Sequence, residues 1–319
     1  MAIDPPTIRL RRLVKHYGQR QALRGIDLDV AGAQILGVVG PDGAGKTTLL
    51  RALAGLLEIE AAQAEVLGHD LRGDVTPLKE VLGYVPQVFS LYRELTVLEN
   101  LKVVARLHGL DAGALEQRAM PVLERTGLAP FVGRQAGKLS GGMKQKLAVT
   151  CALLPNPKIL ILDEPTAGVD VVARDQIWEI LNERKDEVLI LISTSYLEEV
   201  AACDRLVYLD EGRAVALGAP RELCAAVPLE LYRAWGDDPR AIAKAVRALG
   251  YVDGARATGR FARIEVRRAA SPGAERVLRD LRGLRAAGVR LAEQAPLDIE
   301  TMLLALSRNG SSAPEQPGS

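Results

Sequence analysis

The sequence of 319 residues contains little cysteine, little histidine and few aromatic side chains, which make up 4% of it. Its three cysteines, Cys151, Cys203 and Cys224, are odd in number and far apart, and no CxxC pair occurs. This spacing argues against a disulfide framework or a structural zinc site, and it fits packed thiols in a reducing compartment. No histidine follows residue 108.

An excess of charge of one sign and a long apolar run are also absent. Lys and Arg number 41 against 40 Asp and Glu, a formal charge of +1, so we expect no nucleic-acid partner. No window approaches the roughly 18 consecutive apolar residues that span a bilayer, and the start, MAIDPPTIRLRRL, lacks the apolar core of a secretory signal. The sequence therefore predicts a cytoplasmic chain that is soluble alone, with one large domain and one smaller domain.

A glycine-rich turn lies between an apolar run and a helical pattern in residues 34–57, QILGVVGPDGAGKTTLLRALAGLL. Gly40, Gly45, Lys46 and Thr47 fit the spacing of a phosphate loop. In such a loop, glycines let backbone N–H groups close around phosphate oxygens, the lysine adds positive charge and the threonine hydroxyl can bind magnesium. The alternative is a turn that binds nothing, which the lysine and threonine together disfavour.

A second apolar run, ILILDE at residues 159–164, ends in two carboxylates. Buried parallel strands often end in a polar residue, so this run alone says little. Next to a phosphate loop it predicts a site, because ligands of doubly wound sheets bind at the carboxyl ends of the strands. Asp163 would then hold magnesium, directly or through water, and Glu164 would act as general base on the attacking water.

Together with LSGGM at residues 139–143, these patterns resemble the ATP-binding-cassette family over roughly residues 7–222. The resemblance implies a site that binds ATP and magnesium. Nucleotide contacts would come from Tyr17, Gly40, Gly43, Gly45, Lys46, Thr47, Thr48, Ser140, Gly141, Gly142 and Asp170, metal contacts from Thr47, Gln87 and Asp163, and catalysis from Glu164, Gln87 and Ser195.

The same resemblance implies the fold and the partners. The fold would be an α/β cassette of the phosphate-loop nucleotide hydrolases, with a mixed sheet core, an antiparallel β subdomain and a helical subdomain after Gln87. ATP would lie between the phosphate loop of one cassette and the LSGG of another. We therefore expect a second cassette, either identical or, as we favour, different, and a transmembrane permease that places the chain on the inner face of the cell membrane.

The composition changes near residue 228, where arginines become frequent. Residues 228–307 alternate in a β-α-β-β-α-β order and close with a helix, PLDIETMLLALSR, which predicts a small α+β accessory domain after a cassette at 1–227. The arginines fit a solvated face. Cassettes of drug, polysaccharide or lipid exporters often carry such a segment. Residues 308–319 are rich in Ser, Pro and Gly and predict a disordered tail.

Ser195, in ISTSYLEEV, departs from the family pattern, which usually has histidine there to contact the γ-phosphate. A serine is shorter and cannot become cationic near neutral pH. Either a water or the Tyr196 hydroxyl takes over and hydrolysis proceeds, or this chain's own site hydrolyses ATP slowly. We favour the second, because STSYLEE resembles the first cassette of bacterial exporters that fuse two unequal cassettes.

The sequence thus predicts the ATPase subunit of an exporter. One alternative is a cassette protein of translation or DNA maintenance, which would usually carry two cassettes or a long coiled coil. The other is a regulatory, hydrolysis-impaired nucleotide-binding partner, which Ser195 alone supports.

Overall fold

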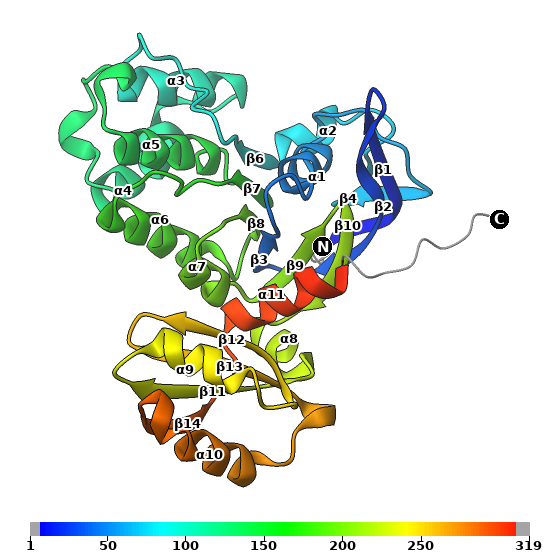
Figure 1. The fold of residues 1–319 in the computed structure, drawn as a ribbon. Helices are drawn as coiled ribbons and strands as arrows, with labels where there is room; N and C mark the ends of the chain where they lie inside the picture. Colours follow the sequence, from blue (N-terminus) through cyan, green and yellow to red (C-terminus); the bar gives the residue numbers. More distant parts are fainter. Residues whose placement is uncertain (1–6, 311–319) are drawn as a thin grey trace. The chain divides into compact units, whose positions relative to one another are not determined.

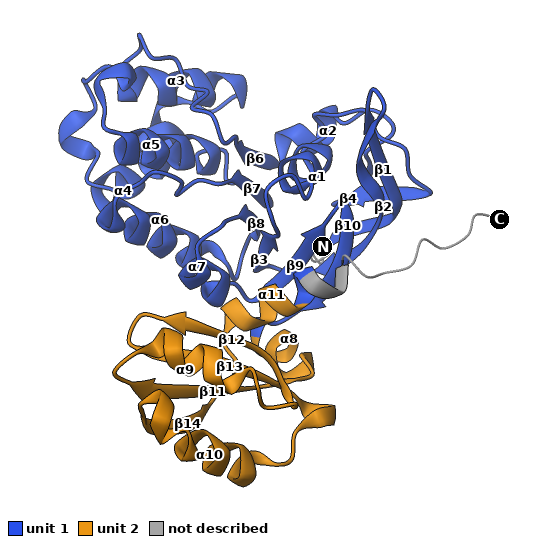
Figure 2. Ribbon diagram, in the orientation of Figure 1, with its two compact units in different colours: residues 1–220, 306–319 blue, residues 221–305 orange. Residues whose placement is uncertain are grey.

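The computed structural model describes residues 7–310 and divides the chain into two compact units. Figure 2 colours the first unit, residues 1–220 and 306–319, blue and the second, residues 221–305, orange. The division falls between Pro220 and Arg221 rather than at the predicted residue 227, because helix α8 (Pro220–Ala226) is grouped with the second unit. No helix within residues 7–310 is long and apolar enough to cross a membrane.

The first unit is built on a six-stranded sheet with the order β10-β9-β3-β8-β7-β6 (Figure 1). Its inner strands are continuous apolar runs and are buried, as expected for parallel strands covered on both faces. All neighbours pair in parallel except the edge pair of β9 and β10. The strands are β3 (Gln34–Val39), β6 (Leu82–Val85), β7 (Ile159–Asp163), β8 (Leu189–Ser193), β9 (Arg205–Asp210) and β10 (Arg213–Gly218).

An antiparallel sheet with the order β2-β1-β4-β5 completes the β part of this unit. Its strands are β1 (Thr7–Tyr17), β2 (Arg20–Ala31), β4 (Gln63–Val66) and β5 (His69–Asp70). The side chains of β1 and β2 that point inward join one core with the helix after β3, α1 (Lys46–Leu53). The remaining helices beside the main sheet are α2 (Thr76–Glu80), α6 (Val171–Arg184) and α7 (Leu197–Ala202).

A helical segment lies between β6 and β7 and has its own apolar core. It contains α3 (Val97–Leu107), α4 (Ala112–Arg125) and α5 (Gly141–Leu153), with 3-10 turns at Ala129–Phe131 and Ala136–Lys138. The start of α3 is fixed by Thr96 and Glu99, each of which bonds the backbone N–H of the other. The predicted mixed sheet, antiparallel sheet and helical segment are therefore confirmed.

The second unit has the predicted β-α-β-β-α-β order, formed by β11 (Leu229–Gly236), α9 (Pro239–Val246), β12 (Val252–Thr258), β13 (Phe261–Arg267), α10 (Ala274–Gly283) and β14 (Val289–Ala295), with 3-10 turns at Arg268–Ala270 and Arg285–Ala287. The strands form an antiparallel sheet in the order β12-β13-β11-β14, and α9 and α10 share its core. The closing helix α11 (Ile299–Gly310) continues into residues 308–310, which the sequence assigned to the tail, and residues 311–319 lie outside the described part of the chain.

Candidate functional site

The loop between β3 and α1 has the backbone that its glycines permit. Gly40 has φ of 151°, and a Cβ there would lie 2.1 Å from the carbonyl oxygen of Leu209. Gly45, the residue before α1, has φ of 106°, and its Cβ would lie 2.9 Å from the oxygen of Ala22. Side chains are therefore excluded at both positions, and the loop packs against β2 and β9 while it leads into the helix.

Lys46 begins α1 and turns back over this loop. Its ammonium donates hydrogen bonds to the carbonyl oxygens of Gly40, at 2.9 Å, and Pro41, at 3.1 Å. The side chain is 8% exposed, and the carboxylate of Asp42 lies 4.0 Å away. The loop thus holds one positive charge at the start of a helix, where the N–H groups already favour an anion.

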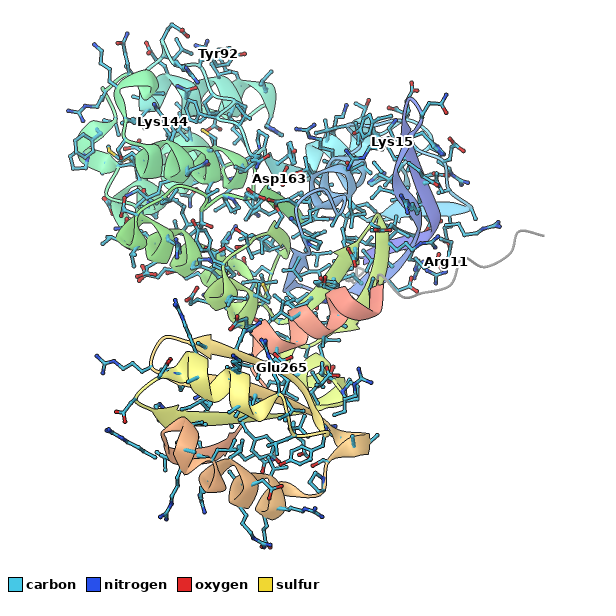
Figure 3. The ribbon with its side chains drawn as sticks, in the orientation of Figure 1. Arg11, Lys15, Tyr92, Lys144, Asp163 and Glu265 are labelled. Carbon is cyan, nitrogen blue, oxygen red and sulfur yellow. The ribbon has the colours of Figure 1, made fainter. Side chains whose placement is uncertain are left out.

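Asp163, which is labelled in Figure 3, lies at the carboxyl end of β7 and is fully buried. Its Oδ1 accepts hydrogen bonds from Thr47 Oγ1 at 3.1 Å and from Ser193 Oγ at 2.8 Å. Its Oδ2 has no hydrogen-bond partner among the described residues. A buried carboxylate oxygen beside a threonine hydroxyl is suited to a hard cation such as magnesium.

Glu164, the next residue, is connected to β8 and to the loop after β6. Its N–H donates to Ser193 Oγ at 2.8 Å, and its Oε2 accepts from Gln87 Nε2 at 2.9 Å. Its φ of 50° is a conformation that costs a non-glycine residue about 1–3 kcal/mol. This backbone directs two successive carboxylates toward different partners, so that one is buried and the other is partly open to solvent.

A cleft of about 510 Å³ brings most of the predicted residues together. It is lined by Tyr17, Gly43, Gly45, Lys46, Thr47, Thr48, Gln87 and Glu164, and also by Arg20, Ala22 and Asp42. Tyr17 is 46% exposed. The exposed ring of Tyr17 and the buried ammonium of Lys46 at the start of α1 both line the cleft. An aromatic ring and a cation in one cleft suit a planar group that carries phosphates.

Two residues near the cleft were missed by the reasoning from sequence. Arg20 pairs with Tyr17 across the β1–β2 turn, and the short Gly18-Gln19 connection between two strands could have indicated this. Ser193 bonds both Asp163 and Glu164. The sequence clue to it was its place at the end of the apolar run LILIS, which pairs with ILILD. To find either residue from the sequence, one would have had to know which strands pair.

The glycine-rich turn at residues 139–143 lies elsewhere in the same unit. Ser140 caps α5, because its Oγ accepts from Met143 N at 3.3 Å. A Cβ on Gly142 would lie 3.2 Å from Asp170 Oδ2, so this turn and the start of α6 are adjacent. Ser140, Gly141, Gly142 and Asp170 are not among the described residues that line the cleft. One chain therefore does not bring the two groups of predicted residues together.

Ser195 follows β8, is exposed, and is also not among the described residues that line the cleft. The ring of Tyr196 is covered by the guanidinium of Arg174, whose carbon lies 3.8 Å from the ring centroid. This contact holds the ring beside α6.

Comparisons with known proteins agree on one family. A family model described as "ABC transporter" matches residues 23–167. The probable multidrug ABC transporter ATP-binding protein YbhF of Escherichia coli (strain K12) is 44% identical over 224 residues, 69% of this chain but only 39% of YbhF. Nod factor export ATP-binding protein I of Burkholderia orbicola (strain AU 1054) is 36% identical over 245 residues, 76% of this chain and 80% of that protein.

Among solved structures, an ATP-binding subunit of an ABC transporter is 29% identical, with a TM-score of 0.63 over 69% of this chain and 92% of that one. The cassette fold predicted from the sequence is therefore confirmed. From these similarities and the cleft at the phosphate loop, we conclude that the chain belongs to the ABC transporter family, among its ATP-binding proteins.

Proposed function

We propose that this chain is the ATP-binding and ATP-hydrolysing subunit of an exporter and that it drives a separate membrane permease. The observation that carries the proposal is the continuous set of hydrogen bonds from Thr47 to Asp163, through Ser193 to Glu164, and on to Gln87. These bonds join the phosphate-binding loop to a catalytic general base, Glu164, at one cleft, as hydrolysis of a nucleotide requires.

Each residue has a chemical role in this proposal. The N–H groups of the loop and Lys46 bind the phosphates, and the ring of Tyr17 stacks on the adenine ring of ATP. Thr47, Asp163 and Gln87 would hold magnesium, which when bound neutralises charge on the phosphate oxygens. Glu164 accepts a proton from the water that attacks the γ-phosphorus, and Gln87 orients the Glu164 carboxylate.

The second cassette follows from the separation of the two groups of residues. Ser140, Gly141 and Asp170 are exposed outside the cleft, and Val171 and Val172 beside them have side chains 65% and 68% exposed. Exposed apolar side chains next to a helix start that can bind phosphate suit the surface of another cassette. We favour a second cassette of different sequence, since Ser195 would then be compensated by a complete site on the other chain.

The permease and the location are inferred from the relatives, which are named for multidrug transport and Nod factor export. In this proposal the chain lies in the cytoplasm on the inner face of the cell membrane, and ATP-dependent closure of the cassette pair moves the permease. A second candidate, a regulatory partner whose own site is slow, is favoured by the exposed Ser195.

Lys46→Ala tests the binding step. Removing a charge-assisted contact to phosphate costs about 1.5–3 kcal/mol, so calorimetry should show Mg-ATP affinity lowered roughly 10- to 150-fold. Lys79→Ala, an exposed lysine on α2 outside the cleft, is the matched control and should bind as the wild type does. Unchanged affinity in Lys46→Ala would show that the phosphate loop is not the nucleotide site.

A further inference from the structure

Hydrogen bonds of Thr194, the residue before Ser195, hold the segment after β8 to the start of α7. Thr194 is 3% exposed, its hydroxyl donates a hydrogen bond to Glu199, and the same hydroxyl accepts from Tyr196 N at 3.1 Å. Glu199 is 2% exposed. Ser195 is thus the exposed member of a short segment whose neighbours are fixed.

Arg174 reaches this segment from α6. Its guanidinium carbon lies 3.8 Å from the centroid of the Tyr196 ring, and its Nε lies 3.7 Å from Glu199 Oε1. Its side chain is 20% exposed. A cation over an aromatic face is favourable, and a buried carboxylate that lost its neighbouring cation would be costly. One side chain therefore holds the ring that follows Ser195 and the acid that holds Thr194.

Arg174 also belongs to the turn of α6 that begins at Asp170. The N–H of Arg174 donates to Asp170 O at 3.0 Å, and Asp170 Oδ1 caps the helix by accepting from Ala173 N at 3.0 Å. Asp170 in turn lies against Gly142 of the glycine-rich turn. The same helix turn therefore contacts the Ser195 segment through Arg174 and the glycine-rich turn through Asp170.

We propose that Arg174 is a positioning residue for ATP hydrolysis at this chain's own cleft. It holds the segment Thr194–Tyr196, and with it Ser195, and it couples the segment to the start of α6. A movement of α6 when a second cassette binds beside Asp170 would then shift Ser195 relative to Glu164. The inference rests on the proposed function, since its role is in hydrolysis.

Three variants separate positioning from stability. Arg174→Met alone leaves the Glu199 carboxylate buried without its cation, so it is combined with Glu199→Gln, which removes both charges. Arg174→Lys keeps a charge but loses the planar group that stacks on Tyr196. Glu179→Gln, at an exposed acid on the same helix, serves as the control.

Two measurements are made on the full chain in its complex purified from the native membrane. Deuterium exchange over residues 192–200 reports how firmly the segment is held. ATP turnover, measured with the catalytic glutamate of any second, different cassette changed to glutamine, gives kcat and KM for this chain's own site. In the double variant we expect faster exchange and a kcat lowered about 10- to 100-fold at unchanged KM, since a small misplacement near the chemistry can cost this much. Arg174→Lys should lose turnover to a similar extent, and Glu179→Gln should match the wild type.

Wild-type exchange or wild-type kcat in the double variant would overturn the proposal. So would full activity in Arg174→Lys, because charge alone would then be sufficient. If the wild-type complex shows no ATP turnover, the proposed function fails, and the exchange measurement alone decides whether Arg174 holds the Ser195 segment.

Discussion

Two serines separated by a single residue occupy opposite environments at the end of β8. Ser193 is fully buried and bonds both Asp163 and the backbone of Glu164, whereas Ser195 is exposed. Ser193 therefore fixes the two carboxylates whatever stands at position 195. Ser195 takes no part in the hydrogen bonds that hold the two acids.

Ser195→His should raise turnover at this chain's own site. An imidazole restores a donor toward the γ-phosphate, and a preorganised donor of this kind contributes about 2.7–4 kcal/mol, or roughly 100- to 1,000-fold in kcat. ATP turnover of the cassette pair measures the effect, because in the proposed pair the glycine-rich turn of the second cassette completes the site.

Two further variants make this result specific. Glu164→Gln in the Ser195→His background should abolish the gain, which separates restored chemistry from tighter binding. Ser195→Ala should not raise the rate of the wild type, which would show that the gain comes from the imidazole and not from loss of the serine hydroxyl. Equal and high rates for the wild type and Ser195→His, both dependent on Glu164, would mean that the serine is a tolerated substitution.

At the scale of an element, the start of α11 is fastened to the sheet of the second unit by a buried cation. Arg263 on β13 is 3% exposed, and it bonds Asp298, Thr301 and Glu300, the last at 2.9 Å. Burial alone would raise the pKa of Asp298, but hydrogen bonds from Thr301 and Arg263 outweigh it and hold this pKa below its ordinary value. The ionised carboxylate therefore stabilises the folded unit.

This pKa shift predicts how stability depends on pH. Because the pKa of Asp298 is lower in the folded chain, its contribution is fully present above the ordinary value of 3.8 and is lost as the pH falls through the folded value. Asp298→Asn should therefore destabilise the second unit by about 1–2 kcal/mol near neutral pH, and the difference from the wild type should shrink below this value.

Urea unfolding followed through Trp235, in a Trp178→Phe background, measures the second unit. Asp237→Asn is the control, because the Asp237–Arg290 pair has side chains 69% and 72% exposed and should contribute almost nothing. A difference between the wild type and Asp298→Asn that stays constant with pH would contradict the role of the charge.

The elements that the sequence predicted best are those whose pattern is local. The strand, turn and helix around residues 34–57 are contiguous, and the β-α-β-β-α-β order could be read from alternating short segments. The arginines of the second unit were predicted as a solvated face, and for Arg263 this is wrong. Its partners Asp298 and Glu300 lie 35 and 37 residues away, so only the packing of α11 on β13 reveals them.

The same limit applies to the cleft. Lys46 and Thr47 were identified from one loop, but the Gln87–Glu164 bond spans 77 residues and depends on β6 pairing with β7. The resemblance to a family supplied Gln87 where the residues alone were uninformative. Neither the sequence pattern nor the resemblance indicated that Arg174 covers Tyr196, because that contact joins α6 to the segment before α7.

At the scale of the whole molecule, the nucleotide cleft belongs to the first unit alone. Every residue that lines it lies between Tyr17 and Glu164, and the second unit begins at Arg221. The first unit also includes residues from Leu306 onward, so the chain returns to it after the second unit ends. Removing everything after Val227 therefore removes most of the second unit, residues 228–305, and a small part of the first.

A chain truncated after Val227 should fold and bind Mg-ATP with the affinity of the full chain, but it should melt at a lower temperature. The reason is Tyr208, which is 3% exposed and whose hydroxyl shares a hydrogen bond with Ser307. A buried hydroxyl without its partner costs about 1–3 kcal/mol, which for a unit of this size lowers Tm by roughly 2–12 °C.

Calorimetry and thermal melting of the two chains measure affinity and stability separately. Tyr208→Phe in the truncated chain should recover part of the lost Tm, since it removes the unpaired hydroxyl, whereas in the full chain the same substitution breaks a bond and should lower Tm. The opposite signs identify Ser307 as the cause. An insoluble or nucleotide-free truncated chain would instead mean that the second unit is required to form the cassette core.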